Sequence, residues 1–118
     1  MLQSVSAKQA FELLSQLDLD IVDVREAGEW ATGHLPGARL VPLAQLREAT
    51  QASLPRDGVL FVCAAGVRSE TAARLALQTG LTKVYNLAGG TRGWQKAGLP
   101  VVKDGDVVEL VPALRATG

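Results

Sequence analysis

Short apolar runs alternate along this chain with stretches in which apolar residues recur at the spacing of one helix face. The clearest run is Val59–Val62, which is apolar at every position and bounded by turn signals, as expected for a strand buried on both faces. Further strands are predicted at residues 20–24, 37–41 and 83–87. Helices are predicted at residues 6–14, 26–32, 43–52, 69–78 and 90–97. This alternation predicts an α/β fold with a mostly parallel sheet.

Turn-forming residues separate these elements. Ser6 is a good cap for the first helix, because its hydroxyl can accept a hydrogen bond from the first turn. Residues 34–37 and 55–58 carry the Pro and Gly of tight turns. Residues 101–112 are predicted to be extended or to form an edge strand.

The composition is typical of one globular domain. The chain has 118 residues, of which 47% are hydrophobic, enough to build a core. Its 12 basic and 12 acidic side chains cancel, so we expect neither a nucleic acid nor a membrane as a partner. No signal-peptide pattern occurs, and no apolar run approaches the roughly 20 residues of a membrane helix. A cytoplasmic protein is therefore expected.

The chain has one cysteine and one histidine. A single cysteine cannot form a disulfide within the chain, and one residue of each kind cannot form a zinc site of cysteine and histidine alone. A reducing compartment is the natural setting for such a protein. The single thiol is therefore free for other chemistry, and its place in the chain indicates which.

Cys63 lies where the buried strand ends and a helix is about to begin. In open α/β sheets, ligands bind beyond the carboxyl ends of the strands. The next residues are mostly small, and Gly66 permits a positive φ, so successive N–H groups can point at one spot. The helix start and Arg68 add positive charge, and such surroundings lower a cysteine pKa from about 8.5 to about 3.5–7.5. The pattern predicts a thiolate nucleophile, against the alternative of a small buried hydrophobe.

Four motifs, in this order along the chain, resemble those of the rhodanese sulfurtransferases. The matching segments are Asp23–Glu26 with Glu29 for the amino-terminal signature, Gly33–Ala38 for the second signature, Cys63–Ser69 for the active-site loop, and Leu87–Gly90 with Gly93 and Trp94 for the carboxyl-terminal signature. The resemblance covers about residues 3–102 and leaves 103–118 as an extension of the same domain or an edge segment. It implies a rhodanese-like α/β fold whose central, mainly parallel five-stranded sheet is flanked by helices.

The resemblance also implies a reaction. Rhodaneses take a sulfane sulfur from a donor such as thiosulfate onto the loop cysteine and pass it, as a persulfide, to a thiophilic acceptor such as cyanide, a thiol or a protein. Cys63 is then the nucleophile, Arg68 binds the anionic donor and steadies the loop, and Asp23 and Arg25 support the site. The persulfide is expected to rest on backbone N–H groups of the loop, which are those of Ala64, Ala65, Gly66, Val67, Arg68 and Ser69. No metal or organic cofactor is required.

Other functions remain open at this point. Related phosphatases have one residue more between their cysteine and arginine, so the shorter spacing between Cys63 and Arg68 favours sulfur over phosphate. A carrier that relays sulfur between proteins, for cofactor or tRNA thiolation, uses the same chemistry. A non-catalytic rhodanese-like binding module is opposed by the intact cysteine and arginine. Because the chain has no second cysteine, the sulfur must leave to an external acceptor.

Four other features have less weight. Val67 is the loop position expected to face outward and to influence the choice of acceptor. His34 sits in a Gly-His-Leu-Pro-Gly turn and is expected to make structural hydrogen bonds. The glycines of Gly89–Gly93 do not have the spacing of a dinucleotide-binding loop. Arg92 either adds positive potential near the loop or is solvated surface.

Overall fold

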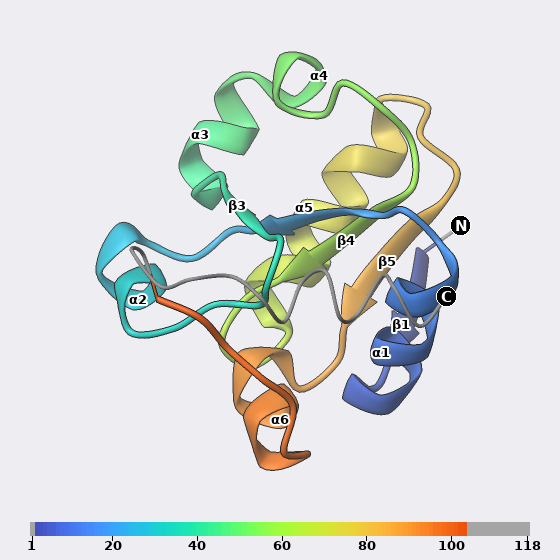
Figure 1. Ribbon diagram of the computed structural model, residues 1–118. Helices are drawn as coiled ribbons and strands as arrows, with labels where there is room; N and C mark the ends of the chain where they lie inside the picture. The colour runs from blue at the N-terminus through green and yellow to red at the C-terminus, as the bar shows by residue number, and fades with distance from the viewer. Residues whose placement is uncertain (1, 104–118) are drawn as a thin grey trace.

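The structure is a computed structural model that describes residues 2–103. Within this range five strands and six helices follow one another (Figure 1). The strands are β1 (Leu2–Val5), β2 (Asp20–Asp23), β3 (Arg39–Leu40), β4 (Val59–Val62) and β5 (Val84–Leu87). The helices are α1 (Ala7–Gln16), α2 (Ala27–Ala31), α3 (Leu43–Glu48), α4 (Thr50–Ser53), α5 (Val67–Gln78) and α6 (Gly90–Lys96).

The strands form a single parallel sheet in the order β1-β5-β4-β2-β3. The predicted α/β class and the implied five-stranded sheet are therefore confirmed. Strand β4 is at the centre, with Val62 paired to Asp23 of β2 and Phe61 paired to Asn86 of β5. In a parallel sheet all carboxyl ends lie at one edge, which is the edge near α2 and α6 in Figure 1.

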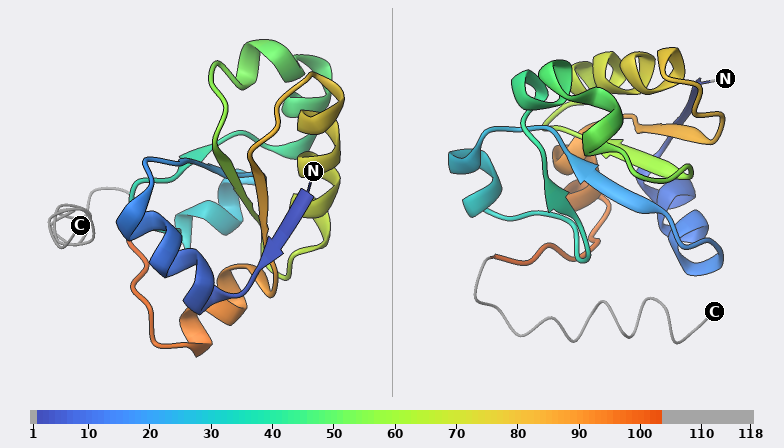
Figure 2. Two further views of the ribbon diagram at one scale, coloured as in Figure 1. Left: turned by 90° about the vertical axis from the view of Figure 1, so that its right-hand side faces the viewer. Right: turned by 90° about the horizontal axis from the view of Figure 1, so that it is seen from above.

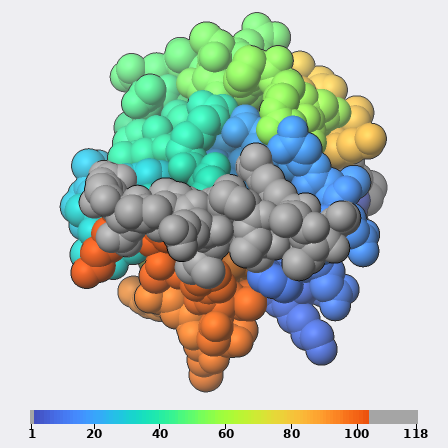
Figure 3. Space-filling view, in the orientation of Figure 1, coloured from blue at the N-terminus to red at the C-terminus, as the bar shows by residue number. Residues whose placement is uncertain are grey.

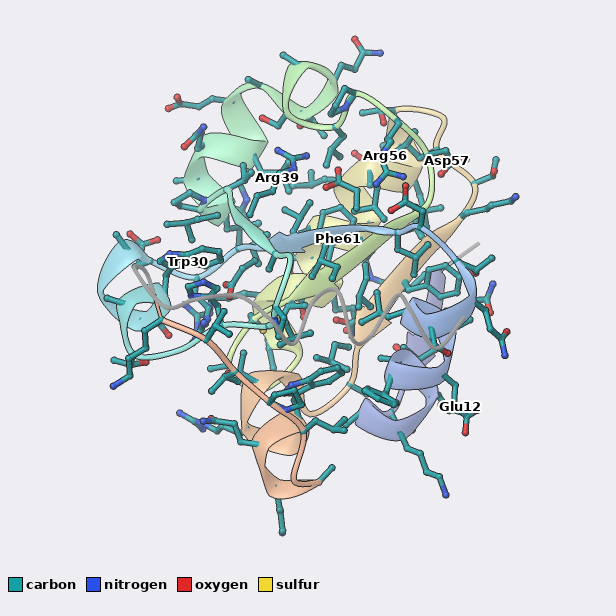
Figure 4. The ribbon with its side chains drawn as sticks, in the orientation of Figure 1. Glu12, Trp30, Arg39, Arg56, Asp57 and Phe61 are labelled. Atoms are coloured by element: carbon teal, nitrogen blue, oxygen red, sulfur yellow. The ribbon has the colours of Figure 1, made fainter. Side chains whose placement is uncertain are left out.

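Helices cover both faces of the sheet, as the two views of Figure 2 show. Val59 and Phe61 of β4 belong to the core that packs against α3 and α5, whereas Leu60 and Val62 belong to the core against α1 and α6. Phe61 lies in the middle of the sheet in Figure 4. All residues of β4 are buried, so the prediction of a strand buried on both faces is confirmed.

Of residues 101–112, which the sequence predicts to be extended or to form an edge strand, 101–103 belong to the described part of the chain, and the fifth strand of the sheet lies elsewhere. It is β1, which pairs with β5 at the other edge of the sheet. Gln3 and Ser4 of β1 are exposed, so this edge strand lacks the apolar pattern that marked the other strands. Val102 makes one antiparallel bridge to His34, with N···O distances of 2.9 and 2.8 Å. Residues 104–112 lie outside the described part of the chain.

Helix ends differ from the prediction by up to two residues, and one predicted helix is divided into two. The first helix starts as expected, since Ser6 and Gln9 form a reciprocal capping box. The predicted helix 43–52 is two helices, because Ala49 has φ −140° and ψ 55° and leaves the helical region. Helix α5 begins at Val67 rather than at residue 69, directly after Gly66 with φ 99°. Arg68 therefore belongs to the first helical turn and not to the preceding loop.

Candidate active site

The carboxyl ends of the three central strands bring the predicted site segments together. Cys63 directly follows β4, Asp23 ends β2, and the Ala88-Gly89 turn directly follows β5. These segments are far apart in sequence, and the parallel sheet aligns them at one edge. Segments of three of the four motifs therefore meet at this edge of the sheet.

The loop after β4 wraps around the sulfur of Cys63. The backbone N–H of Gly66 donates to Sγ at 3.1 Å. The left-handed conformation of Gly66, with φ 99°, turns the loop back toward the sulfur, and a side chain at this position would be strained. Cys63 itself is 1% exposed, so the loop closes over most of the thiol.

Backbone N–H groups of helix α6 bind the carbonyl groups of the loop from outside. The N–H of Thr91 donates to the carbonyl of Cys63 at 2.8 Å, and the N–H of Arg92 donates to that of Ala64 at 3.1 Å. A Cβ at Gly90 would lie 2.4 Å from the backbone atoms of both loop residues, so the close approach requires glycine. With its carbonyls bound to α6, the loop can turn its N–H groups toward the sulfur.

Ser69 and Asn86 form a buried polar group beside the sulfur. Oγ of Ser69 lies 3.3 Å from Sγ of Cys63 and donates to Oδ1 of Asn86 at 2.5 Å, while Nδ2 of Asn86 donates to the carbonyl of Gly66 at 3.3 Å. Only the backbone N–H of Ser69 is predicted at the site from the sequence, and Asn86 is not predicted there. The available signal was a polar residue within the otherwise apolar strand segment Val84–Leu87, since buried polar groups require partners.

The surroundings of Cys63 act on its pKa in opposite directions. Burial raises the pKa of the thiol, because it disfavours the charged form. A hydrogen bond with the Ser69 hydroxyl, whose single proton must turn from Asn86 to the sulfur when the thiol ionises, and hydrogen bonds from the N–H groups of Ser69, Ala65 and Gly66 more than offset this. The pKa of Cys63 therefore lies below its ordinary value. The predicted direction agrees with this shift. The main causes of the lower pKa are hydrogen bonds of the loop and first helical turn, and the charge of Arg68 is not among the largest of them.

Arg68 is bound to a carboxylate rather than directed at the sulfur. Its Nη1 and Nη2 donate to the two carboxylate oxygens of Glu29, both at 2.8 Å. The hydrogen bond from Arg68 lowers the pKa of Glu29 to about 2, and the same bond raises the pKa of Arg68. Glu29 belongs to α2, so the pair ties this helix to the first turn of α5. This geometry fits the expectation that Arg68 steadies the site, and the expectation that Arg68 binds a donor stays a prediction.

Asp23 and Arg25 form a buried ion pair at the end of β2. Nε of Arg25 donates to both oxygens of Asp23 at 3.0 and 3.1 Å, and Nη2 donates to Oδ2 at 2.8 Å and to the carbonyl of Gly33 at 2.8 Å. Asp23 is 0% and Arg25 is 4% exposed, and each neutralises the charge of the other. This geometry matches the supporting role expected for the two residues.

Two further predicted features are found where expected. Val67 is 74% exposed and faces outward from the start of α5. His34 is buried in its turn, with Nδ1 3.0 Å from the carbonyl of Trp30. Among residues 2–103, no group of three or more His, Cys, Asp or Glu side chains is placed to hold a metal ion. Over the same residues, no helix is long and apolar enough to cross a membrane.

A family model described as the rhodanese-like domain matches residues 6–97. The chain belongs to the rhodanese-like domain family. The matched range contains all four motifs noted in the sequence and all strands except β1. The resemblance recognised from the motifs is thereby confirmed.

Curated rhodanese relatives include proteins that are longer than the matched segment. The chain is 39% identical over 74 residues to the uncharacterized protein YqhL and 36% identical over 80 residues to the "Putative sulfur carrier protein YrkF", both of Bacillus subtilis. These matches cover 63% and 68% of this chain but only 59% and 43% of the relatives. Thiosulfate sulfurtransferase GlpE of Pseudoalteromonas translucida is 29% identical over 93 residues, which cover 79% of this chain and 89% of that protein.

Solved rhodanese structures have the same fold. A rhodanese-related protein of Thermoplasma volcanium superposes with a TM-score of 0.76 at 32% identity, over 85% of this chain and 97% of that one. The human single-domain sulfurtransferase TSTD1 superposes with a TM-score of 0.67 at 30% identity, over 79% and 95% of the two chains. These structures share the rhodanese-like fold with this chain.

Proposed function

We propose that this rhodanese domain transfers a sulfane sulfur from a small anionic donor such as thiosulfate to a thiophilic acceptor through a persulfide on Cys63. The observation that carries the proposal is the hydrogen-bonded thiol at the end of the central strand, whose pKa the surrounding donors lower. A thiolate at neutral pH is the form that attacks sulfur. Relatives named as sulfurtransferases support this class of reaction.

The chemistry proceeds in two displacements at sulfur. The Cys63 thiolate attacks the outer sulfur of thiosulfate, the S–S bond of the donor breaks, and sulfite leaves with the electron pair. The persulfide formed on Cys63 keeps one negative charge on its outer sulfur. The acceptor, cyanide or a thiolate, then attacks that outer sulfur, and the Cys63 thiolate leaves. Neither step requires a metal or a redox cofactor.

The loop suits both steps because a negative charge stays next to it throughout. The N–H of Gly66 and the hydroxyl of Ser69 lie at the thiol sulfur, and the loop carbonyls are occupied by α6. Donors that are already oriented need no reorganisation when the charge moves from one sulfur to the next. The pair of Arg68 and Glu29 contributes by holding α2 against the start of α5.

Mass spectrometry of the intact protein tests the proposal. After incubation with thiosulfate and removal of excess donor, the protein should gain about 32 Da, the mass of one sulfur atom, and cyanide should restore the original mass. Cys63→Ser should gain no mass and should turn over no substrate. An unchanged mass of the wild-type protein, or normal turnover by Cys63→Ser, contradicts the proposal.

A relay of sulfur between proteins is the second candidate function. It is favoured by the exposed Val67 and Ala65, which give the rim of the loop a small apolar surface that a protein partner can cover. The relative named as a sulfur carrier points the same way. The persulfide-loaded protein, freed of small donors, should then pass its sulfur to a carrier protein faster than to an equal concentration of a free thiol.

A further inference from the structure

The loop that holds Cys63 carries no free cationic side chain for an anionic donor. Its positions 64, 65 and 67 are Ala, Ala and Val. Arg68 follows, but both of its terminal nitrogens are bound to Glu29, and this contact neutralises its charge. A donor with an anionic end must therefore find its positive charge outside the loop.

A cleft next to the loop contains such charge. It is lined by Ala64 of the loop, by Arg25 and Glu29 near α2, and by Arg92 and Gln95 of α6. Ala64 is the residue after Cys63, so this cleft borders the loop that encloses the sulfur. In Figure 3, helix α6 (orange) stands out at the lower edge of the molecule, where a solute can approach it.

Arg25 presents an unused amino group to this cleft. Its Nε and Nη2 are bound to Asp23 and to the carbonyl of Gly33, whereas Nη1 has no hydrogen-bond partner among the described residues. Over the same part of the chain, no enclosed side-chain nitrogen lacks a partner. Nη1 of Arg25 is therefore open to solvent. Because Arg25 lines the cleft, we take the cleft to be the space that Nη1 faces. The rest of the side chain is buried and held, so the donors of Nη1 are preoriented.

Arg92 supplies the charge that Arg25 and Arg68 do not. Each of those two arginines is paired with a carboxylate, whereas Arg92 is exposed and has no ion pair among the described residues. Its backbone is fixed to the loop, because its N–H donates to the carbonyl of Ala64. The side chain therefore starts at the loop and lines the cleft with an uncompensated positive charge.

We infer that Arg92, together with Nη1 of Arg25, binds the anionic end of the sulfur donor in this cleft while the outer sulfur faces Cys63. Planar guanidinium groups are well matched to sulfonate-like oxygens, as they are to carboxylates and phosphates. Arg92 is then the residue that selects an anionic donor over a neutral one. That the bound anion is a sulfur donor rests on the proposed function, whereas the binding of the anion does not.

The binding test uses the Cys63→Ala protein, which cannot react, titrated with thiosulfate and followed by calorimetry. Adding Arg92→Gln should weaken thiosulfate binding about tenfold, as expected for a lost charged hydrogen bond. Arg92→Lys keeps the charge but loses the forked guanidinium group. Its affinity for thiosulfate should lie between that of Arg92→Gln and that of the protein with Arg92 intact. Lys96→Gln is the matched control, because Lys96 is an exposed cation of the same helix that does not line the cleft. Equal effects of Arg92→Gln and Lys96→Gln overturn the inference.

Kinetics of the Cys63-containing protein separate this inference from the proposed function. With thiosulfate as donor and dithiothreitol as neutral acceptor, Arg92→Gln should raise KM for thiosulfate about tenfold and change kcat by less than about threefold. If KM for the acceptor rises equally, Arg92 does not select the donor and the inference is wrong. If thiosulfate binds as described but leaves no sulfur on Cys63, the proposed function fails while the anion site stands.

Discussion

The two ends of the central strand β4 both surround an anion with backbone N–H groups, but they do so for different purposes. At the amino end, Asp57 accepts hydrogen bonds from the N–H groups of Gly58, Thr82 and Lys83 and from the hydroxyl of Thr82, at 2.8–3.0 Å. At the carboxyl end, Gly66 and Ser69 lie at the sulfur of Cys63. Figure 4 shows Asp57 and the labelled Trp30 of α2 on opposite sides of the molecule.

The difference lies in which group is the anion. At the amino end the anion is a permanent carboxylate on an exposed turn, and its hydrogen bonds join the starts of β4 and β5. At the carboxyl end the group is a buried thiol, whose pKa lies below its ordinary value because hydrogen bonds more than offset the effect of burial. The first arrangement stabilises the fold, and the second holds a reactive group ready. The comparison predicts that changes at the two ends affect different measurements.

The largest expected effect is that of Gly90→Ala at the carboxyl end. The new Cβ would lie 2.4 Å from backbone atoms of Cys63 and Ala64, and Gly90 has φ 58°, so helix α6 must move off the loop. We expect the free energy of unfolding in urea to fall by about 2–4 kcal/mol. Because the loop around Cys63 is disturbed, the rate at which iodoacetamide alkylates Cys63 should change as well.

Gly98→Ala is the matched control for backbone strain. Gly98 has φ 79° but nothing within 4 Å of a Cβ, so only the strain of about 1 kcal/mol is expected. Equal losses of unfolding free energy in Gly90→Ala and Gly98→Ala would show that the contact between α6 and the loop contributes nothing. The close packing of α6 on the loop would then be wrong.

The next effect belongs to the amino end. Asp57→Asn should lower the free energy of unfolding by about 1–2 kcal/mol at pH 7 and leave the alkylation of Cys63 unchanged. Hydrogen bonds from Thr82, Gly58 and Lys83 hold the pKa of Asp57 below its ordinary value. This stabilisation is therefore complete above about pH 4 and disappears as the pH falls further, so the difference from wild type should shrink in acid. Asp18→Asn, at an exposed and weakly paired carboxylate, should change stability by less than about 0.5 kcal/mol.

Much of this comparison was predictable from the sequence. The apolar run Val59–Val62 and the turn signals around it located both ends of β4, and the spacing from Cys63 to Arg68 identified the loop. These features are local, because a buried strand, a turn and a small-residue loop each depend on neighbours in the chain.

The contacts that determine the chemistry were not predictable in the same way. Glu29 and Arg68 are 39 residues apart, and Ser69 and Asn86 are 17 apart, so each pair meets only once the sheet has formed. The residues next to Arg68 in the sequence do not show that its guanidinium group pairs with a carboxylate. Strand β1 was missed for a related reason, since an exposed edge strand is specified by its partner β5 and not by its own pattern.

A smaller effect is expected at the sulfur itself. Ser69→Ala removes a hydroxyl that lowers the pKa of Cys63, so the midpoint of the pH dependence of iodoacetamide alkylation should rise. The sign follows because a lost donor destabilises the thiolate. Thr71→Ala, which removes a hydroxyl elsewhere on α5, should leave the midpoint unchanged. A midpoint that stays or falls in Ser69→Ala would contradict the assigned hydrogen bond.

The smallest effect on stability is that of Glu29→Gln. The pair of Glu29 and Arg68 is more than a third exposed, so solvent screening limits its contribution to about 0.5–1 kcal/mol. The pKa of Glu29 is lowered to about 2 from an ordinary value of 4.5. The stabilisation is therefore complete above pH 4.5, and the loss in Glu29→Gln should vanish as the pH falls toward 2. Glu70→Gln, at a pair on the surface of α5, should cost less than Glu29→Gln at neutral pH.

Glu29→Gln also sharpens the comparison between the two ends, because it changes the charge that faces a donor. With the carboxylate removed, Arg68 becomes a second uncompensated cation beside the loop. Thiosulfate binding to the unreactive Cys63→Ala protein should then tighten, by about threefold for a partly screened charge. Asp57→Asn removes the same charge at the far end of β4 and should leave that binding unchanged. Equal tightening in both variants would mean that net charge, and not the position of the arginines, attracts the donor.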